Sequence, residues 1–388
     1  MKITANGLTL HADDSGHGPL ALVFLHYWGG TARTWQPVIA ALPANLRKIA
    51  LDARGWGRSD RPADGYDIAT MADDVEAAIA ALDLEHYVLV GHSMGGKVAQ
   101  LLASRRPSGL AGLVLVAPSP AEGKSLSGPE RDAMAGAYAT SESVGWTIDN
   151  VLTERRLSPV MRDQVIADSL GGAEAAKQFW PHTAISEDVS VDLARIGVPV
   201  RVIGGENDKV DGVDMLRHVV LPSLPGAVMQ SISGGGHLLP LEVPQALAAS
   251  IAEFVDTECS GGCRTATRPE ELPTIFDAAL NRGDIDAVTS LFHPEAIMRM
   301  QDGETIAEGH EGLRTALAQL IAARPELRNG VRRVIASGDI ALLLLDWTIR
   351  LAPPDRDEIV ERGVATQVVE RNADGIWQLR ISNPLGIG

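Results

Sequence analysis

Residues 86–97 read HYVLVGHSMGGK, and this stretch decides the fold. The run HYVLV is typical of a buried strand, and the glycines of GHSMGG permit a sharp turn that larger side chains would obstruct. A helix is predicted next, at residues 97–104, so Ser93 stands on a tight turn between a strand and a helix. Such a turn exposes a serine hydroxyl above the end of a sheet, which makes Ser93 a candidate nucleophile.

Short apolar runs of the same character recur through the first 256 residues, separated by helical patterns such as 68–82. Buried strands are predicted at residues 20–25, 46–51, 86–90, 110–116 and 198–203. Strands that alternate with helices form a parallel sheet covered on both faces. The sequence therefore predicts an α/β fold with a doubly wound, mostly parallel sheet.

One insertion interrupts this alternation. About 80 residues separate Val116 from Val198, and most of them have helical patterns. A simple crossover between neighbouring strands needs far less chain. We expect a helical cap at about 119–196, over the carboxyl edge of the sheet.

A serine hydroxyl needs a base to become a nucleophile, and two later strand ends supply the partners. Asp208 follows the strand at 198–203, and His237 follows a glycine run after the next strand. The chain order serine, acid, histidine matches a hydrolase triad. Ser93 is the predicted nucleophile, His237 the general base and Asp208 the acid that orients it. Asp211 and Glu206 are the alternative acids.

Residues 1–256 resemble the α/β-hydrolase superfamily in five stretches that occur in order: FLHYWGG, LDARGWGRSD, VGHSMGG, GGENDKV and GGGHLLPLEVP. The resemblance implies a serine hydrolase of the esterase type that works without a cofactor or metal. The serine at position 93 argues against the haloalkane dehalogenase and epoxide hydrolase branches, which have an aspartate there.

In that fold, two backbone N–H groups bind the oxyanion, and the resemblance assigns them to Trp28 and Met94. The family's usual His-Gly is His26-Tyr27 here, which puts a bulky Tyr27 at the floor of the pocket. Three further aromatic residues either shape an apolar acyl pocket or fill the core of the cap: Trp146, Phe179 and Trp180.

The composition changes at residues 256–269, where small and polar residues replace apolar ones. We predict a domain boundary there, with a hydrolase domain at 1–256, a linker at 257–269 and a second domain at 270–388. The second domain reads as helices followed by long strands, which predicts an α+β fold.

Three stretches of the second domain resemble the nuclear-transport-factor-2-like superfamily, which includes SnoaL-like cyclases: FDAALNRGDIDAVTSLFHPEAIM, the Gly309–Gly312 turn and ADGIWQLRISNP. The resemblance implies a cone-shaped domain. The run IALLLLDWTIRL at 340–351 is apolar on both alternating faces, so we expect this domain to pair two copies in a homodimer.

The net charge of −16 at pH 7 argues against nucleic acid and membrane surfaces as partners, and it disfavours polyanionic substrates. No apolar run is long enough to span a membrane, and the first residues lack the pattern of a secretory signal, so a cytoplasmic location is expected. Cys259 and Cys263 do not fit a zinc site and are interpreted as linker thiols, with a regulatory disulfide as the alternative.

These features together predict a serine hydrolase that cleaves a small carboxylic ester or lactone through an acyl-enzyme. Two alternatives remain at this point. The same triad could hydrolyse a carbon–carbon bond, or the protein could be a ligand-binding receptor that retains the triad.

Overall fold

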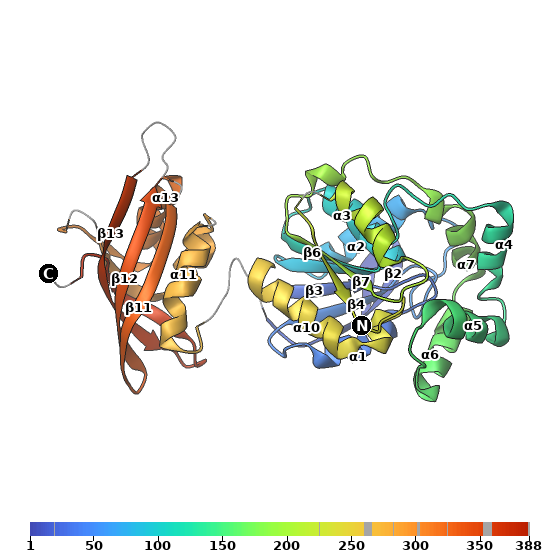
Figure 1. The fold of residues 1–388 in the computed structure, drawn as a ribbon, viewed down its shortest axis with the longest axis horizontal. Coiled ribbons are helices and arrows are strands. Elements are labelled where there is room, and N and C mark those ends of the chain that lie inside the picture. Colours follow the sequence, from blue (N-terminus) through green and yellow to red (C-terminus); the bar gives the residue numbers. More distant parts are fainter. Residues whose placement is uncertain are drawn as a thin grey trace. The chain divides into compact units, whose positions relative to one another are not determined.

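The computed structural model describes residues 1–386 except 19, 225, 260–265, 282, 301–302, 324 and 352–358. The chain divides into two compact units, Met1–Cys259 and Ser260–Gly388 (Figure 1). The predicted linker at 257–269 spans this division, and Cys263 lies outside the described residues.

The first unit contains an eight-stranded sheet with the order β1-β2-β4-β3-β5-β6-β7-β8. Its strands are β1 (Lys2–Ala5), β2 (Leu8–Ser15), β3 (Ala21–Leu25), β4 (Arg47–Asp52), β5 (Tyr87–His92), β6 (Leu110–Val116), β7 (Val200–Gly205) and β8 (Val228–Ile232). The β1–β2 and β2–β4 pairs are antiparallel, and all other pairs are parallel. This confirms the predicted fold class, and it adds the first two strands, which the sequence analysis did not predict.

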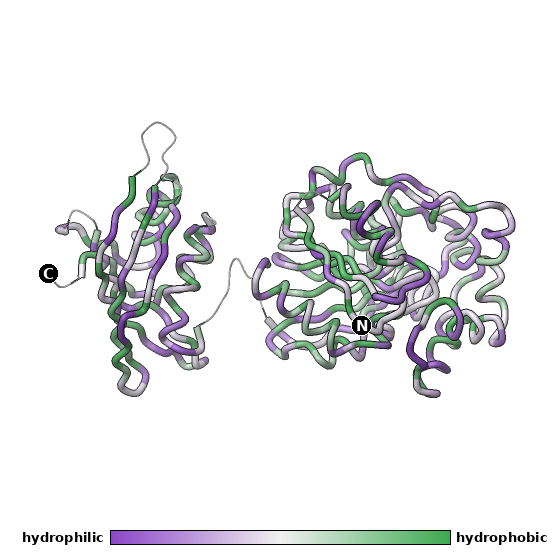
Figure 2. The backbone as a smooth tube through the Cα atoms, viewed as in Figure 1, coloured by the Kyte–Doolittle hydropathy of each residue, from purple (hydrophilic) through white to green (hydrophobic). Residues whose placement is uncertain are grey.

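Helices cover both faces of this sheet, because alternate strand residues point to opposite sides. Val88 and Val90 of β5 belong to one hydrophobic core with α1 (Gln36–Ala41) and α10 (Pro244–Phe254). Leu89 belongs to the other core, with α2 (Ile68–Ala81) and α3 (Met94–Ser104). Apolar stretches accordingly run through the strands in the middle of this unit (Figure 2).

Four α-helices lie between β6 and β7 and are grouped at one end of the first unit (Figure 1). They are α4 (Gly128–Gly136), α5 (Ser141–Thr147), α6 (Pro159–Leu170) and α7 (Glu174–His182). The buried Lys97 of α3 ties the end of this insertion to the sheet unit, since its Nζ donates to the carbonyls of Ala184, Ile185 and Glu187. Burial lowers the pKa of Lys97 to about 8.

Cys259 lies in the core of the first unit rather than in an open linker, which corrects the interpretation from sequence. Its free thiol is buried among residues that include Phe254, and a Cβ on Gly112 would lie 2.2 Å from its sulfur. Burial raises the pKa of this thiol far above its ordinary value. A buried, protonated thiol of this kind is unreactive.

The second unit is an α+β domain with its own sheet, in the order β10-β9-β14-β13-β12-β11. The elements are α11 (Leu272–Asn281), α12 (Ile285–Ser290), β9 (Phe292–Arg299), β10 (Ile306–Glu308), α13 (Gly309–Ala322), β11 (Pro325–Ser337), β12 (Ile340–Leu351), β13 (Ile359–Arg371) and β14 (Trp377–Asn383). One face of β12 is buried through Ala341, Leu343 and Leu345, which join the helices in a separate core.

Candidate active site

Ser93 occupies the turn between β5 and α3, as predicted, with a φ of +51°. That conformation is unfavourable for a residue with a side chain, and it places the hydroxyl at the end of the strand. The neighbouring positions 91 and 95 have no room for a side chain and therefore require glycine. A Cβ on Gly91 would lie 2.4 Å from the carbonyl oxygen of Gly95, and a Cβ on Gly95 would lie 2.6 Å from that of Leu25.

Asp208 and His237 follow β7 and β8, and the structure brings them together. His237 Nδ1 lies 2.8 Å from Asp208 Oδ2, and both side chains are buried. The other carboxylate oxygen of Asp208 accepts hydrogen bonds from the backbone N–H groups of Val210 (2.7 Å) and Asp211 (3.1 Å). Nδ1 of His237 therefore carries the proton, which leaves Nε2 as the basic nitrogen.

The charges of this pair stabilise each other. Burial alone would raise the pKa of Asp208, but the nearby His237 and the two backbone donors hold it below its ordinary value. Burial alone would lower the pKa of His237, but the charge and hydrogen bond of Asp208, with a contribution from Asp211, raise it above 6.5. The carboxylate is thus ionised at neutral pH, and the imidazole titrates above its usual range.

A pocket of about 620 Å³ contains Ser93 and His237 in its wall. Tyr27, Trp146 and Trp180, candidate pocket residues from the sequence, are among the residues that line it. Phe179 is not among the lining residues; its ring instead lies 6.5 Å from that of Tyr66. Ser93 is only 7% exposed, and the cap helices α4 and α5 also contribute to the wall of this pocket.

The loop after β3 presents the candidate oxyanion donor Trp28. The N–H of Ala53 donates to His26 Nε2 at 3.0 Å, so the proton of this imidazole is on Nδ1. Nδ1 in turn lies 2.7 Å from the carbonyl oxygen of Tyr27. That carbonyl shares a peptide plane with the N–H of Trp28, so holding one fixes the direction of the other. Among the described residues, the N–H groups of Trp28 and Met94 have no hydrogen-bond partner.

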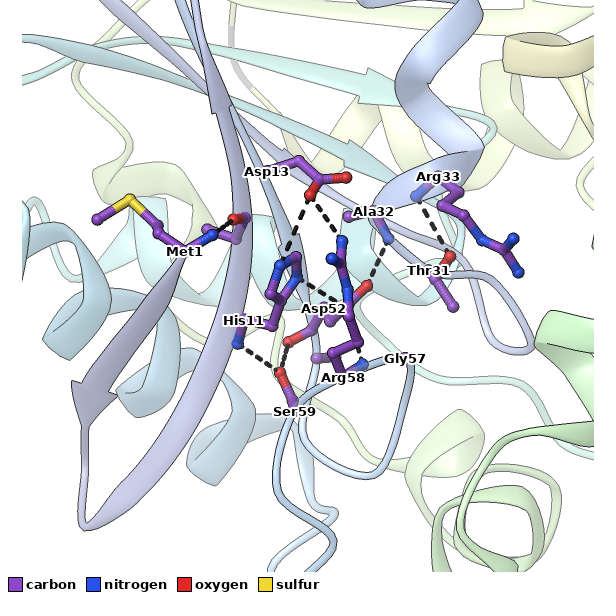
Figure 3. A network of polar contacts seen from close by, with 12 residues as sticks. Met1, His11, Asp13, Thr31, Ala32, Arg33, Asp52, Gly57, Arg58 and Ser59 are labelled. Atoms are coloured by element: carbon purple, nitrogen blue, oxygen red, sulfur yellow. Dashed lines mark hydrogen bonds and ion pairs between the residues drawn. The ribbon is translucent and has the colours of Figure 1, made fainter.

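Asp52, at the end of β4, anchors the other end of this loop (Figure 3). Its carboxylate accepts hydrogen bonds from the N–H groups of Ala32 (2.7 Å) and Arg58 (2.9 Å), and it lies 3.1 Å from His11 Nδ1. A Cβ on Gly57 would lie 2.3 Å from this carboxylate. The sequence analysis quoted the stretch LDARGWGRSD but assigned no role to it, because its contacts are made with residues far away in the chain.

The cap holds the same loop from the other side. Tyr138 Oη donates to the carbonyl of Trp28 at 2.9 Å, and the two rings are stacked with centroids 4.1 Å apart. Ser169 Oγ donates to the carbonyl of Gly29 at 3.0 Å. The loop after β3, which carries Trp28, is therefore fixed by both the sheet and the cap.

The two alternative acids have other partners. Glu206 accepts a hydrogen bond from Ser233 Oγ at 2.7 Å. Asp211 is buried in the pocket wall and lies 2.6 Å from Lys124 Nζ, an ion pair that the sequence did not predict. Asp208 is thus the carboxylate that is hydrogen-bonded to His237. The described residues contain no cluster of His, Cys, Asp and Glu side chains suited to a metal ion.

Comparison with known proteins agrees with this geometry. The chain belongs to the α/β-hydrolase fold family, whose model matches residues 21–244, and residues 274–378 match the SnoaL-like domain. Homologues and structural neighbours of the first unit are α/β-fold hydrolases, which makes this chain a hydrolase by family. No helix in the described part of the chain is long and apolar enough to cross a membrane.

Individual relatives cover the first unit or extend beyond it. The AB hydrolase superfamily protein YisY of Bacillus subtilis is 30% identical over 264 residues, which cover 65% of this chain and 97% of that protein. The uncharacterized protein Rv2715 of Mycobacterium tuberculosis is 25% identical over 334 residues, 80% of this chain and 89% of its own. An esterase structure from Exiguobacterium antarcticum has a TM-score of 0.61 at 22% identity and covers 66% of this chain and 99% of its own.

Proposed function

We propose that this protein is a serine hydrolase that cleaves a small carboxylic ester or lactone through an acyl-enzyme on Ser93. The observation that carries the proposal is that His237, which lies 2.8 Å from Asp208, lines the same pocket as Ser93. In this arrangement His237 Nε2 takes the proton of the Ser93 hydroxyl as the oxygen attacks the substrate carbonyl.

The remaining steps use groups already in place. The N–H groups of Trp28 and Met94 stabilise the oxyanion, and protonated His237 gives its proton to the leaving alkoxide. Water, activated by the same histidine, then releases the acid and frees Ser93. Asp208 stays ionised throughout and stabilises the imidazolium.

The pocket favours a small substrate with an apolar part. Its wall is built largely from apolar and aromatic side chains, including Met134, Tyr138, Leu152 and Ile185 besides the tryptophans. A volume of about 620 Å³ is in the range of small-molecule sites. The structural neighbour from E. antarcticum is an esterase, which supports an ester as the substrate class.

A panel of nitrophenyl esters of increasing acyl length and a set of lactones tests this function. We expect steady turnover of at least one member of the panel, and its loss in Ser93→Ala with an unchanged melting temperature. Stable retention of a ligand without turnover would favour a receptor instead. Retention of most activity in Ser93→Ala would rule out the serine mechanism.

We also propose that the SnoaL-like unit pairs two copies of the chain. A row of apolar side chains crosses four neighbouring strands at Ile335, Leu342, Val368 and Ile381. Ile335 is 53% exposed and Ile381 is 40% exposed, although both are large and apolar. Exposed apolar surface on a sheet is typical of an interface, and twofold dimers are the most common symmetric assembly.

A further inference from the structure

The pocket contains polar groups that the proposed mechanism does not use. Trp28 Nε1, Ser119 Oγ and Asp211 Oδ2 are buried, belong to residues of the pocket wall, and have no hydrogen-bond partner among the described residues. Buried polar groups are nearly always paired in folded proteins, because an unpaired one has lost its water without replacement. Three such groups in one wall indicate a ligand that brings hydrogen-bonding groups of its own.

The ion pair between Lys124 and Asp211 is the most informative of these features. Lys124 Nζ lies 2.6 Å from Asp211 Oδ1 and donates to the carbonyl of Val210 at 3.1 Å. An ammonium group has three N–H donors, so one remains without a partner within the described chain. The pair therefore offers one free donor on Lys124 and one free acceptor on Asp211.

The charge of the pair restricts what it can bind. Because its two charges offset each other, the pair offers neither a substrate carboxylate nor an ammonium group a net attraction, and each of these groups would meet one like charge. A neutral hydroxyl group both accepts and donates a hydrogen bond, so it can satisfy both residues at once. A ketone could satisfy only Lys124 and would leave Asp211 unpaired.

The position of the Lys124–Asp211 pair within the pocket indicates which part of the substrate it contacts, the acyl part. Asp211 is 1% exposed, as is Ser119, whereas Trp146 of the same pocket is 62% exposed and marks its mouth. When Ser93 attacks an ester, the leaving alcohol dissociates, while the acyl group stays bonded to Ser93 inside the pocket. When Ser93 attacks a lactone, the leaving oxygen remains attached to the acyl chain as a new hydroxyl group. The buried subsite is therefore suited to the acyl group.

We propose that Lys124 and Asp211 form a subsite for a hydroxyl group on the acyl part of the substrate, so that the protein selects hydroxyacyl esters or lactones. This inference rests on the proposed serine hydrolase function and names its substrate class.

The test compares two matched esters on the full chain, nitrophenyl butanoate and nitrophenyl β-hydroxybutanoate. We expect the wild-type protein to have at least about a tenfold higher kcat/KM for the hydroxy ester, the factor that one well-formed hydrogen bond contributes. In the double variant Lys124→Met with Asp211→Leu, this ratio should fall to near one. Both charges are removed together because a single substitution would leave a buried charge unpaired.

Lys177→Met is the matched control. Lys177 is also a lysine of the insertion and also pairs with a carboxylate, that of Glu174 at 3.0 Å, but it is not part of the pocket wall. The preference for the hydroxy ester should be retained in this variant. Melting temperatures of all variants show whether each is folded.

Three results would overturn the inference. The wild-type protein could turn over both esters equally, or the double variant could keep the preference. Asp211→Asn could instead lower kcat for both esters to the same extent and shift the pH profile, which would show that Asp211 acts through His237. Absence of any Ser93-dependent turnover is a separate result: it refutes the proposed function, and the inference with it.

Discussion

His92, the residue before Ser93, is hydrogen-bonded to the backbone of His237: its Nε2 lies 2.8 Å from the carbonyl oxygen of His237. The ring of His92 is completely buried, and burial together with the nearby His237 lowers its pKa to about 3. His92 is therefore neutral at physiological pH, with its proton on Nε2 facing the carbonyl. This contact links the turn that carries Ser93 directly to the loop that carries His237.

Replacing this donor should therefore disturb catalysis more than binding. His92→Phe keeps an aromatic ring but leaves the His237 carbonyl unpaired, which typically costs about 1–3 kcal/mol. We expect kcat to fall about tenfold or more while KM changes little. His218→Phe is the control, since His218 is exposed and its ring bonds, in the described part of the chain, to the carbonyl of Asp214 in its own turn. An unchanged kcat in His92→Phe would show that this link is structural only.

The pH dependence of the rate should report the His237–Asp208 pair. His237 must be neutral to accept a proton, and its pKa is raised above 6.5, so kcat/KM should rise with pH and reach its plateau only above neutrality. Asp208→Asn removes the charge that raises this pKa. The rising limb should then move to lower pH, and the plateau should fall by about 10⁴-fold. A limb that stays in place in the variant would contradict the assignment of Asp208.

Gly29 should be essential for the conformation of the loop after β3, which carries the proposed oxyanion donor Trp28. It has a φ of +97°, and a Cβ there would lie 2.4 Å from the Tyr138 ring. Gly29→Ala should displace the loop and lower kcat by about 100-fold, the usual effect of losing one oxyanion donor. Gly7→Ala isolates backbone strain, because Gly7 has a φ of +75° but nothing within 4 Å of its Cβ position. It should reduce stability by about 1–2 kcal/mol without changing kcat. Equal kcat values in Gly29→Ala and Gly7→Ala would refute the proposed role of Gly29.

The association of the chain should depend on the second unit. A chain truncated after Cys259 keeps both cores of the first unit and should be monomeric and active, whereas the full chain should be dimeric. The cut lies after Cys259 rather than at the start of the predicted linker, residue 257, because Cys259 is part of the core. Light scattering on both proteins provides the measurement.

Surface variants then locate the interface. Ile335→Lys with Ile381→Lys should make the full chain monomeric, whereas Val191→Lys, at a valine of the first unit that is 88% exposed, should not. A monomeric full chain at micromolar concentration, or a truncated chain that is equally dimeric, would refute the proposed role of the second unit.

The part of the site that lies at strand ends could be predicted from the sequence. Ser93 and Asp208 each follow a buried strand whose apolar run is visible without a structure, and His237 follows the glycine run after β8. A parallel sheet brings such strand ends to one edge. The β1–β2 hairpin was not predicted, because β2 ends in the polar stretch HADDS rather than in an apolar run. Lys124, Tyr138 and His92 could not be assigned from sequence either, since their roles depend on partners far away in the chain.

Phe179 shows what could not be predicted from the sequence of the cap. It was grouped with Trp146 and Trp180 because all three are aromatic. The rotation of α7 decides which face of that helix Phe179 and Trp180 each occupy. Trp180 is buried at the pocket and Phe179 lies near Tyr66 instead. In a short helical insertion, composition predicts that a pocket or core exists but not which aromatic residues reach it.

The central claim is that Ser93 is the nucleophile, and covalent labelling tests it most directly. A fluorophosphonate reacts with a serine only where a base and an oxyanion site activate it. Peptide mass spectrometry of the treated protein should find one phosphonylated residue, Ser93, with labelling lost in both Ser93→Ala and His237→Ala. An active protein that remains unlabelled at Ser93, or that is labelled equally without His237, would contradict the account.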